Sequence, residues 1–117
     1  MKIELIQGDT SKTYKFQRKT MDGTPITTIA AKMWITFKYN QEKENAVFQK
    51  TLENGIIYNE EDNYYRFRIE AEDTENLYPG TYGFDIAIIN EDGEKKTLYN
   101  NGILEILDHY TKKVNEV

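Results

Sequence analysis

Short segments in which apolar and polar residues alternate recur along this chain, and they constrain its fold more than any other feature. The alternation is cleanest over Tyr64–Ile69 and extends furthest over Thr81–Ile89. A period of two residues is typical of a strand with one buried and one exposed face. Met33–Lys38 alternates in the same way. The residues expected to face the core in these three segments are Met33, Ile35, Phe37, Tyr65, Phe67, Ile69, Tyr82, Phe84, Ile86 and Ile88.

Further strands are expected where shorter apolar stretches lie between clusters of Gly, Asn and Asp. These stretches are Thr13–Lys19, Val47–Leu52, Ile56–Tyr58, Lys95–Tyr99 and Ile103–Leu107. A type I′ hairpin turn is predicted at Asn90-Glu91-Asp92-Gly93, and a second turn at Asn100-Asn101-Gly102. A single helical turn or two is expected within Glu70–Leu77, which Pro79-Gly80 ends.

Seven or eight strands at intervals of about 8–12 residues favour an all-β fold, an antiparallel immunoglobulin-like β-sandwich, over a parallel sheet. The sandwich is expected over residues 1–107, with one short helical turn near 70–77, and a polar tail over 108–117. Tyr82 follows an acidic corner and a glycine, as in the tyrosine corner of immunoglobulin-like domains, although an ordinary core aromatic fits the same pattern. Trp34 lies opposite Met33 and Ile35, so it is not expected to be the buried tryptophan of an antibody domain.

The composition excludes several classes of function. The 117 residues are enough for one domain with its own core. The chain contains no cysteine, which excludes disulfides, thiolate metal sites and cysteine nucleophiles. Twenty acidic and 15 basic residues leave a net charge of −5, which argues against binding to a nucleic-acid backbone.

The chain is not expected to be secreted by a signal peptide or to enter a membrane. The first residues, Met1–Asp9, soon turn polar and lack the apolar core of a signal peptide. The longest apolar run, about Ile86–Ile89, is far shorter than a membrane helix. We expect a protein that is made and kept in a cytoplasm, or that leaves it within an assembly or by lysis.

Residues that support catalysis are few. The only histidine, His109, lies in the polar tail, and the only serine, Ser11, lies in a loop where it is expected to cap a turn. Paired carboxylates would suit a glycosidase, but some of twenty acidic residues come close together by chance. We therefore predict that the protein is not an enzyme and has no catalytic residue.

No cofactor or metal site is predicted either. The chain has no glycine-rich phosphate-binding motif, and a single histidine without cysteine does not make a zinc site. Oxygen ligands for calcium occur at Glu60–Asn63 and Asn90–Glu94. Neither matches a calcium-binding loop, and the hairpin turn explains the second.

The charge is distributed unevenly along the chain. Residues 1–40 carry a net charge of +4, and residues 41–117 carry −9. Complementary charges of this kind would orient head-to-tail packing between copies. The alternative is that strands from both segments interleave, so that the charges mix on the surface.

Outward-facing aromatic residues form the second surface feature. Exposed Trp and Tyr beside Arg are the residue types enriched at interaction hot spots. The candidate interaction surface consists of Trp34, Tyr64, Arg66 and Arg68, with Tyr39 or Tyr58 as further members. A second reading is that single exposed aromatics are an ordinary feature of protein surfaces.

The order of several segments resembles a family of phage proteins. The segments are Ile3–Thr10, Tyr14–Arg18, Met33–Lys38, Phe48–Leu52, Glu72–Leu77 and Gly80–Ile86. This arrangement is similar to small structural proteins of phages and prophages of low-GC Gram-positive bacteria. In particular it resembles the immunoglobulin-like N-terminal domain of the baseplate upper protein family. The resemblance covers residues 1–107 and consists of strand and turn patterns.

The resemblance implies a non-enzymatic virion component that binds other tail or baseplate proteins and repeats by symmetry, as a homo-oligomer. Baseplate upper proteins usually continue into segments that hold receptor-binding proteins, whereas this chain has only a ten-residue tail. It is therefore expected to be a stand-alone module or to serve elsewhere in the particle. An alternative is a sandwich that binds glycan at the cell surface through Trp34 and Tyr64, since sugars stack on aromatic rings.

Overall fold

The computed structural model describes residues 1–39 and 45–108. Within them the chain is almost entirely β, with one short helix. In chain order the elements are β1 (Lys2–Ile6), β2 (Tyr14–Phe16), β3 (Lys32–Lys38), β4 (Phe48–Leu52), β5 (Gly55–Asn59), β6 (Tyr64–Phe67), α1 (Ala71–Thr74), β7 (Gly80–Ile89) and β8 (Lys95–Leu107). The predicted all-β class, the strand number and the short helical turn are confirmed. The polar stretch Asn40–Asn45, whose sequence indicates a loop, and the predicted tail over 108–117 lie almost wholly outside the described residues.

The eight strands form one hydrogen-bonded sheet in the order β1-β8-β7-β3-β4-β5-β6-β2, curled into a half-barrel. Of the pairings between them, five are antiparallel, whereas β1–β8 and β4–β5 are parallel. The sequence predicted an antiparallel arrangement, and these two pairs correct it. The pair β1–β8 joins the first and last strands of the described chain, whereas β4 and β5 are consecutive strands that meet across the tight Glu53–Asn54 connection.

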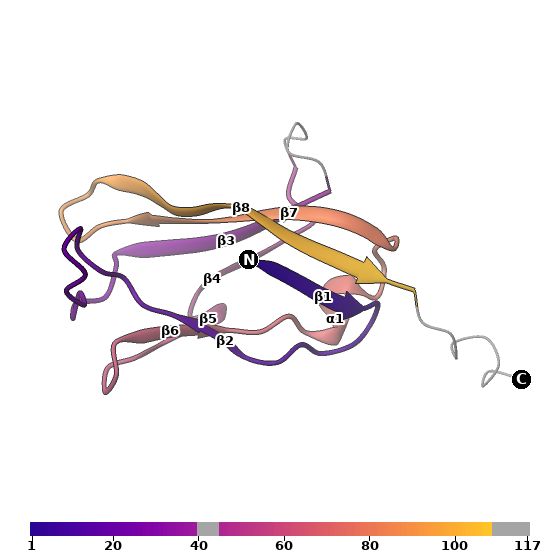
Figure 1. Ribbon diagram of the computed structural model, residues 1–117, viewed down its shortest axis with the longest axis horizontal. Coiled ribbons are helices and arrows are strands. Elements are labelled where there is room, and N and C mark those ends of the chain that lie inside the picture. Colours follow the sequence, from indigo (N-terminus) through magenta and orange to yellow (C-terminus); the bar gives the residue numbers. More distant parts are fainter. Residues whose placement is uncertain (40–44, 109–117) are drawn as a thin grey trace, which may run out of the picture.

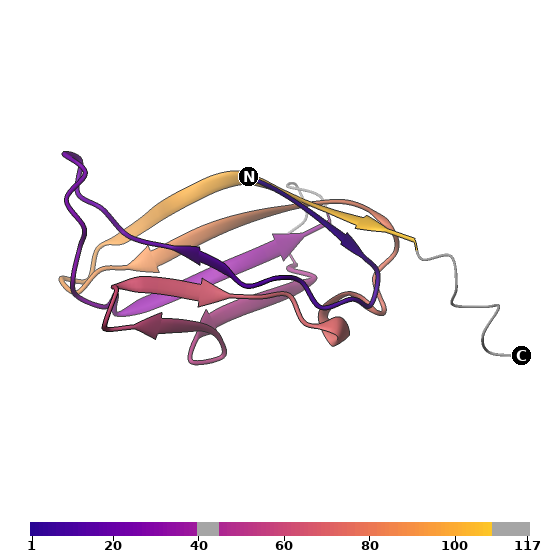
Figure 2. The ribbon, with the colours of Figure 1, turned by 60° about the horizontal axis from the view of Figure 1, so that its bottom comes forward.

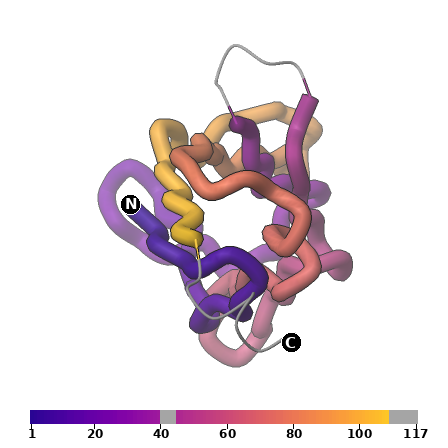
Figure 3. Tube along the Cα trace, turned by 90° about the vertical axis from the view of Figure 1, so that its right-hand side faces the viewer, coloured from indigo at the N-terminus to yellow at the C-terminus, as the bar shows by residue number. Residues whose placement is uncertain are grey.

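The curl divides the sheet into two layers around one core (Figures 1 and 2). The larger layer contains β1, β8, β7, β3 and β4, and the smaller contains β5, β6 and β2. Only two residue pairs, Thr51–Gly55 and Leu52–Ile56, connect the layers through the β4–β5 ladder. Figure 3 looks along the long axis and shows the strands surrounding the interior.

The core consists of the residues that the alternation assigns to the inner face. All ten residues predicted to face inward in the three strongest segments are buried. Ile3, Ile56, Leu104 and Ile106 join them from β1, β5 and β8. Tyr14 and Phe16 of the edge strand β2 are only half-buried, and they stack on Phe67 and Tyr65 of β6.

The turn predicted at Asn100-Asn101-Gly102 does not form. β8 continues through these residues, with irregular pairing to β7 near Phe84 and Ile86. Gly102 is needed for another reason, because a Cβ atom there would lie 2.5 Å from the Phe84 ring. The glycine makes room for a core aromatic. Its position after two asparagines resembles a turn in the sequence, but the strand continues there.

The hairpin between β7 and β8 forms where it was predicted, but its turn type differs. Asn90 N donates to Glu94 O, and Gly93 N donates to Asn90 O. Gly93 has a φ of 90°, and it is the only residue of this turn with a positive φ. A type I′ turn needs positive φ at both central residues, so this is a type I turn followed by a left-handed glycine.

The segment between β1 and β2 crosses from one layer to the other and is held by the region around α1. Gln7 donates its side-chain amide to Leu77 O, and Gly8 N donates to the buried Thr74 hydroxyl at 3.0 Å. Ser11 accepts a hydrogen bond from Ile69 N at 2.9 Å. These contacts place the two sheet edges, β1 and β2, in different layers although they are close in sequence.

The uneven charge along the chain does not divide the surface into two. Residues 1–40 contribute β1 and β2, which are the two ends of the sheet, and β3, which lies in its middle. Strands from both segments therefore interleave, and the charges mix. The head-to-tail packing derived from this asymmetry loses its basis.

Candidate functional site

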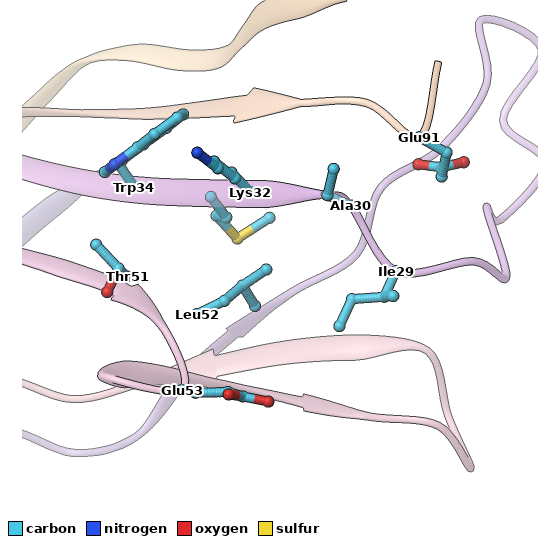
Figure 4. A pocket seen from close by; sticks show the side chains of 10 residues that line it. Ile29, Ala30, Lys32, Trp34, Thr51, Leu52, Glu53 and Glu91 are labelled. Carbon is cyan, nitrogen blue, oxygen red and sulfur yellow. The ribbon is translucent and has the colours of Figure 1, made fainter. Parts of the chain in front are cut away.

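An apolar groove lies where the beginning of β3 approaches the end of β4. Its volume is about 610 Å³, and Figure 4 shows its walls. It is lined by Ile29, Ala30, Ala31, Lys32, Met33, Trp34, Thr51, Leu52, Glu53 and Glu91. Trp34 and Thr51 are register partners on β3 and β4, so the indole lies directly beside the threonine. In the view of Figure 4, Leu52 lies between Trp34 and Glu53.

A second hollow of about 270 Å³ continues the groove onto β5. It shares Ile29, Leu52 and Glu53 with the first and extends to Ile57 and Tyr58. Ile57 is 67% exposed and Ile29 is 47% exposed, although both are large and apolar. We call the two hollows together the Trp34 groove. A continuous apolar surface of this kind is typical of a site that another molecule covers.

The tight connection between β4 and β5 builds the floor of the groove. Glu53 and Gly55 both have positive φ values, 66° and 108°. A Cβ atom at Gly55 would lie 2.6 Å from a side-chain carbon of Lys50, so only glycine lets the chain turn here. This turn brings Leu52 and Ile57 to the same surface.

The edge of the groove is predominantly acidic. Three exposed carboxylates, Glu53, Glu60 and Glu91, line the two hollows, against one lysine, Lys32. Hydrogen bonds to its carboxylate hold the pKa of Glu91 below its usual value. The Thr28 hydroxyl contributes most, and the Glu91 backbone and Arg18 contribute less. Glu91 is therefore ionised at neutral pH.

Buried Arg18 fixes one end of the groove. Its side chain is 4% exposed and donates to Thr28 O at 2.6 Å and to Glu91 at 3.0 Å. Its Nε also donates to the Tyr65 hydroxyl, which accepts a further hydrogen bond from Ala30 N. The groove wall around Ala30 is thus preformed rather than loose.

The four residues predicted to form an interaction surface do not lie together. Trp34 is on β3 and lines the groove, whereas Tyr64 and Arg66 are on β6 and Arg68 follows it. In the sheet, β4 and β5 separate β3 from β6. The structure therefore does not bring Trp34 together with Tyr64, Arg66 and Arg68, and binding at either place stays a prediction.

The charges near Tyr64 are already compensated within the chain. The Lys15 ammonium lies 5.1 Å from the centre of the Tyr64 ring. Arg66 forms an ion pair with Asp62, which lowers the pKa of that carboxyl, and Arg68 pairs with Glu70. A partner would have to displace these contacts, so this face is the poorer binding surface of the two.

The two further aromatic candidates have different positions. Tyr58 is half-buried at the edge of the Trp34 groove and donates a hydrogen bond to Asn63 Oδ1 at 2.7 Å. Tyr39 is largely exposed, and its ring contacts the edge of the buried Tyr82. Tyr58 therefore belongs to the groove and Tyr39 does not.

The residues considered for catalysis and metal binding have structural roles where they are described. Ser11 accepts from Ile69 N and donates to Lys12 O, while His109 lies outside the described residues. The Asn90–Glu94 segment forms the hairpin turn, and Asp62 is occupied by Arg66. Residues 1–39 and 45–108 contain no group of three or more potential metal ligands. In the same ranges no helix has the length and apolar character needed to cross a membrane.

Comparison with known proteins adds no relative. No protein-family model matches the sequence, and no curated protein matches it. The site therefore has to be interpreted from its own residues.

The sequence interpretation missed most of the groove. Ile29 lies in a loop, and Ile57 alternates outward next to the buried Ile56. The outward position of Ile57 was a usable signal, because an isoleucine on the polar face of a strand is unusual. The sequence around Ile29 did not indicate that this residue lines the groove, because the path of its loop depends on the contacts of Arg18 with Thr28 and Glu91.

Proposed function

We propose that this protein is a non-enzymatic structural module of a phage tail or baseplate, which assembles by protein–protein contacts and is located in the virion. The observation that carries the proposal is the Trp34 groove, a preformed apolar surface with an acidic edge. It suits an extended segment of a partner protein with apolar and basic side chains. The resemblance to phage structural proteins suggests that the partner is another tail or baseplate protein.

An immunoglobulin-like sandwich is part of this proposal. In such a domain, strands C, F and G form one layer, strands B, E and D the other. The order β8-β7-β3 in one layer and β5-β6-β2 in the other supports this assignment. So does the hydrogen bond from the Tyr82 hydroxyl to Tyr78 O, at 2.7 Å, which has the geometry of a tyrosine corner.

The virion location is tested by the composition of phage particles. Particles released from the bacterium that carries the gene are purified and digested, and their peptides are identified by mass spectrometry. We expect peptides of this protein in amounts comparable to other tail components. If the protein is abundant in the lysate but missing from purified particles, the proposal is wrong.

The role of the groove is tested by complementing a deletion of the gene with variants. Ile57→Asp places a charge on the most exposed apolar residue of the groove and is expected to reduce the yield of intact particles at least tenfold. Leu98→Asp is the matched control, since Leu98 is an exposed apolar residue on β8 outside the groove. Both variants should retain the circular dichroism spectrum of the wild type. Equal yields from both would exclude the groove as the contact surface.

Glycan binding is a second candidate, which the half-exposed indole of Trp34 beside Thr51 and two carboxylates favours. Trp34 is the only tryptophan, so its fluorescence reports directly on occupancy of the groove. Titration with cell-wall polysaccharide from the host is expected to give a saturable change if the groove binds sugar. A flat titration excludes this candidate and leaves the assembly role unaffected.

A further inference from the structure

The strand β1 has one side that no other strand of the sheet occupies. Among residues 1–39 and 45–108 it is the end of the sheet order, and the one ladder it forms there is the parallel one with β8. Ile103 N donates to Met1 O, and Gln7 N donates to Leu107 O. In a parallel ladder alternate residues carry these bonds, so the odd-numbered residues of β1 bond to β8. The backbone groups of Lys2 and Glu4 therefore point away from the sheet.

Charges on the outer face of β1 and β8 are arranged unevenly. Glu4 and Glu105 are register partners, so two carboxylates lie side by side. Lys2 is paired in register with Ile103 and reaches the carboxylates diagonally, at 3.3 Å from Glu4 and 3.2 Å from Glu105. These carboxylates raise the pKa of Lys2. A second cation placed directly beside the two carboxylates would complete the arrangement.

A second copy of the chain provides that cation. If two β1 strands pair antiparallel about a two-fold axis at Ile3, Lys2 of each copy lies opposite Glu4 of the other. The residues with free backbone groups then face each other, and each such pair exchanges both of its hydrogen bonds. Opposite charges across such a pair are stabilising, whereas like charges are destabilising.

The neighbouring registers are disfavoured by the same rule. Pairing about Glu4 would place the two copies of this carboxylate directly opposite each other. Pairing about Lys2 would likewise place two ammonium groups opposite each other. The charges of β1 therefore select the register about Ile3 over those about Lys2 and Glu4. Met1, which is 55% accessible, lies next to the paired strands and becomes partly covered.

We propose that the protein forms a two-fold symmetric dimer in which the β1 strands of two copies pair antiparallel about Ile3 and join the two sheets. This inference goes beyond the proposed function, because it names the partner and does not depend on the Trp34 groove. It leaves the groove of each copy free for another protein.

The test is a charge swap at the two-fold axis, measured by light scattering after size exclusion over a hundredfold concentration range. The chain is used without an N-terminal tag. We expect the wild type to dimerise, and K2E and E4K each to dimerise about tenfold more weakly, because each replaces two opposite-charge pairs with like-charge pairs. An equimolar mixture of K2E and E4K should form a heterodimer, since both cross-strand pairs are again complementary. Thermal unfolding of each variant verifies that it is folded.

Three results would overturn the inference. A wild type that stays monomeric throughout excludes the dimer. A wild-type dimer that K2E and E4K leave unchanged uses another surface. If both variants are folded monomers and their mixture stays monomeric, the charges do not meet across the axis. In each case the composition of phage particles still tests the proposed function separately.

Discussion

Two buried cations, Lys50 and Arg18, connect the layers of the sheet in different ways. Lys50 lies on the inner face of β4, is 8% exposed, and forms an ion pair with Asp73 of α1. Arg18, which follows β2, divides its hydrogen bonds among the Thr28 carbonyl, the Tyr65 hydroxyl and Glu91. The helix α1 and the hairpin that carries Glu91 lie at opposite ends of the long axis (Figure 1).

The difference lies in how much each cation depends on one charged partner. Asp73 is largely buried and also accepts a hydrogen bond from Glu70 N, so it compensates Lys50 and caps α1 at once. Glu91 is 49% exposed and is one of three acceptors around Arg18. A guanidinium suits this shared arrangement because its donors spread in a plane, whereas an ammonium is a point charge. Removal of a single acidic residue should therefore affect the two ends unequally.

The largest effect is expected for Asp73→Ala. This substitution leaves the Lys50 ammonium buried without its carboxylate and removes a helix cap, so it should lower the free energy of unfolding by about 3 kcal/mol. Urea unfolding followed by circular dichroism measures it. Glu72→Ala, at an exposed neighbour on the same helix, is the control and should change little. A loss below about 1 kcal/mol for Asp73→Ala would show that the ion pair is not a major contact.

A double-mutant cycle sharpens this measurement. In a Lys50→Met background no buried ammonium depends on Asp73, and the methionine fills similar volume. The cost of Asp73→Ala should then fall to that of the cap alone, about 1 kcal/mol.

An intermediate effect is expected for Tyr65→Phe at the other end. The hydroxyl accepts from Ala30 N at 3.0 Å and from Arg18 Nε at 3.3 Å, and both donors are buried. Leaving them without an acceptor should cost about 2 kcal/mol. Tyr64→Phe, on the outer face of the same strand, should cost less than about 0.5 kcal/mol in the same urea experiment. Equal losses for the two variants would contradict the role of the Tyr65 hydroxyl.

The smallest effect is expected for Glu91→Gln, at most about 1 kcal/mol, because half of the side chain is in water and Arg18 keeps two other acceptors. The pKa of Glu91 is lower in the folded protein than its ordinary 4.5. Its contribution is therefore complete above that value and is lost as the pH falls through the folded pKa. Thermal unfolding between pH 7 and pH 3 should show a smaller destabilisation by acid in Glu91→Gln than in the wild type. Parallel curves for the two proteins would exclude this contribution.

Both buried cations could have been identified from the strand pattern. The alternation that places Tyr14 and Phe16 on one face also places Arg18 there, and Lys50 lies on the same face of its strand as Phe48 and Leu52. The pattern indicates which side of a strand a cation faces. It does not reveal which acceptor it will meet, since Asp73 and Glu91 are far from their partners in sequence.

In the candidate site too, local patterns indicate which way a side chain faces but not which residues lie beside it. The outward position of Trp34 was predicted from the alternation, and the indole lines the groove. Tyr64, Arg66 and Arg68 were grouped with it by residue type, but two strands, β4 and β5, separate them from Trp34 in the sheet. Their charges are compensated by Asp62 and Glu70, two acidic neighbours that the grouping did not consider.

Local periodicity was enough to determine most of the strands and their buried faces, the short helix and the hairpin at residues 90–93, although it did not single out β1 and divided β8 in two. Those features depend on contacts between residues near each other in the chain and on the simple separation of apolar from polar surface. Tertiary structure alone decided the parallel pairs β1–β8 and β4–β5, the continuous path of β8 and the formation of the groove. The β1–β8 pair and the groove bring together residues that are far apart in sequence, and the β4–β5 pair depends on the left-handed backbone of Glu53 and Gly55, so the alternation of neighbouring residues does not reveal them.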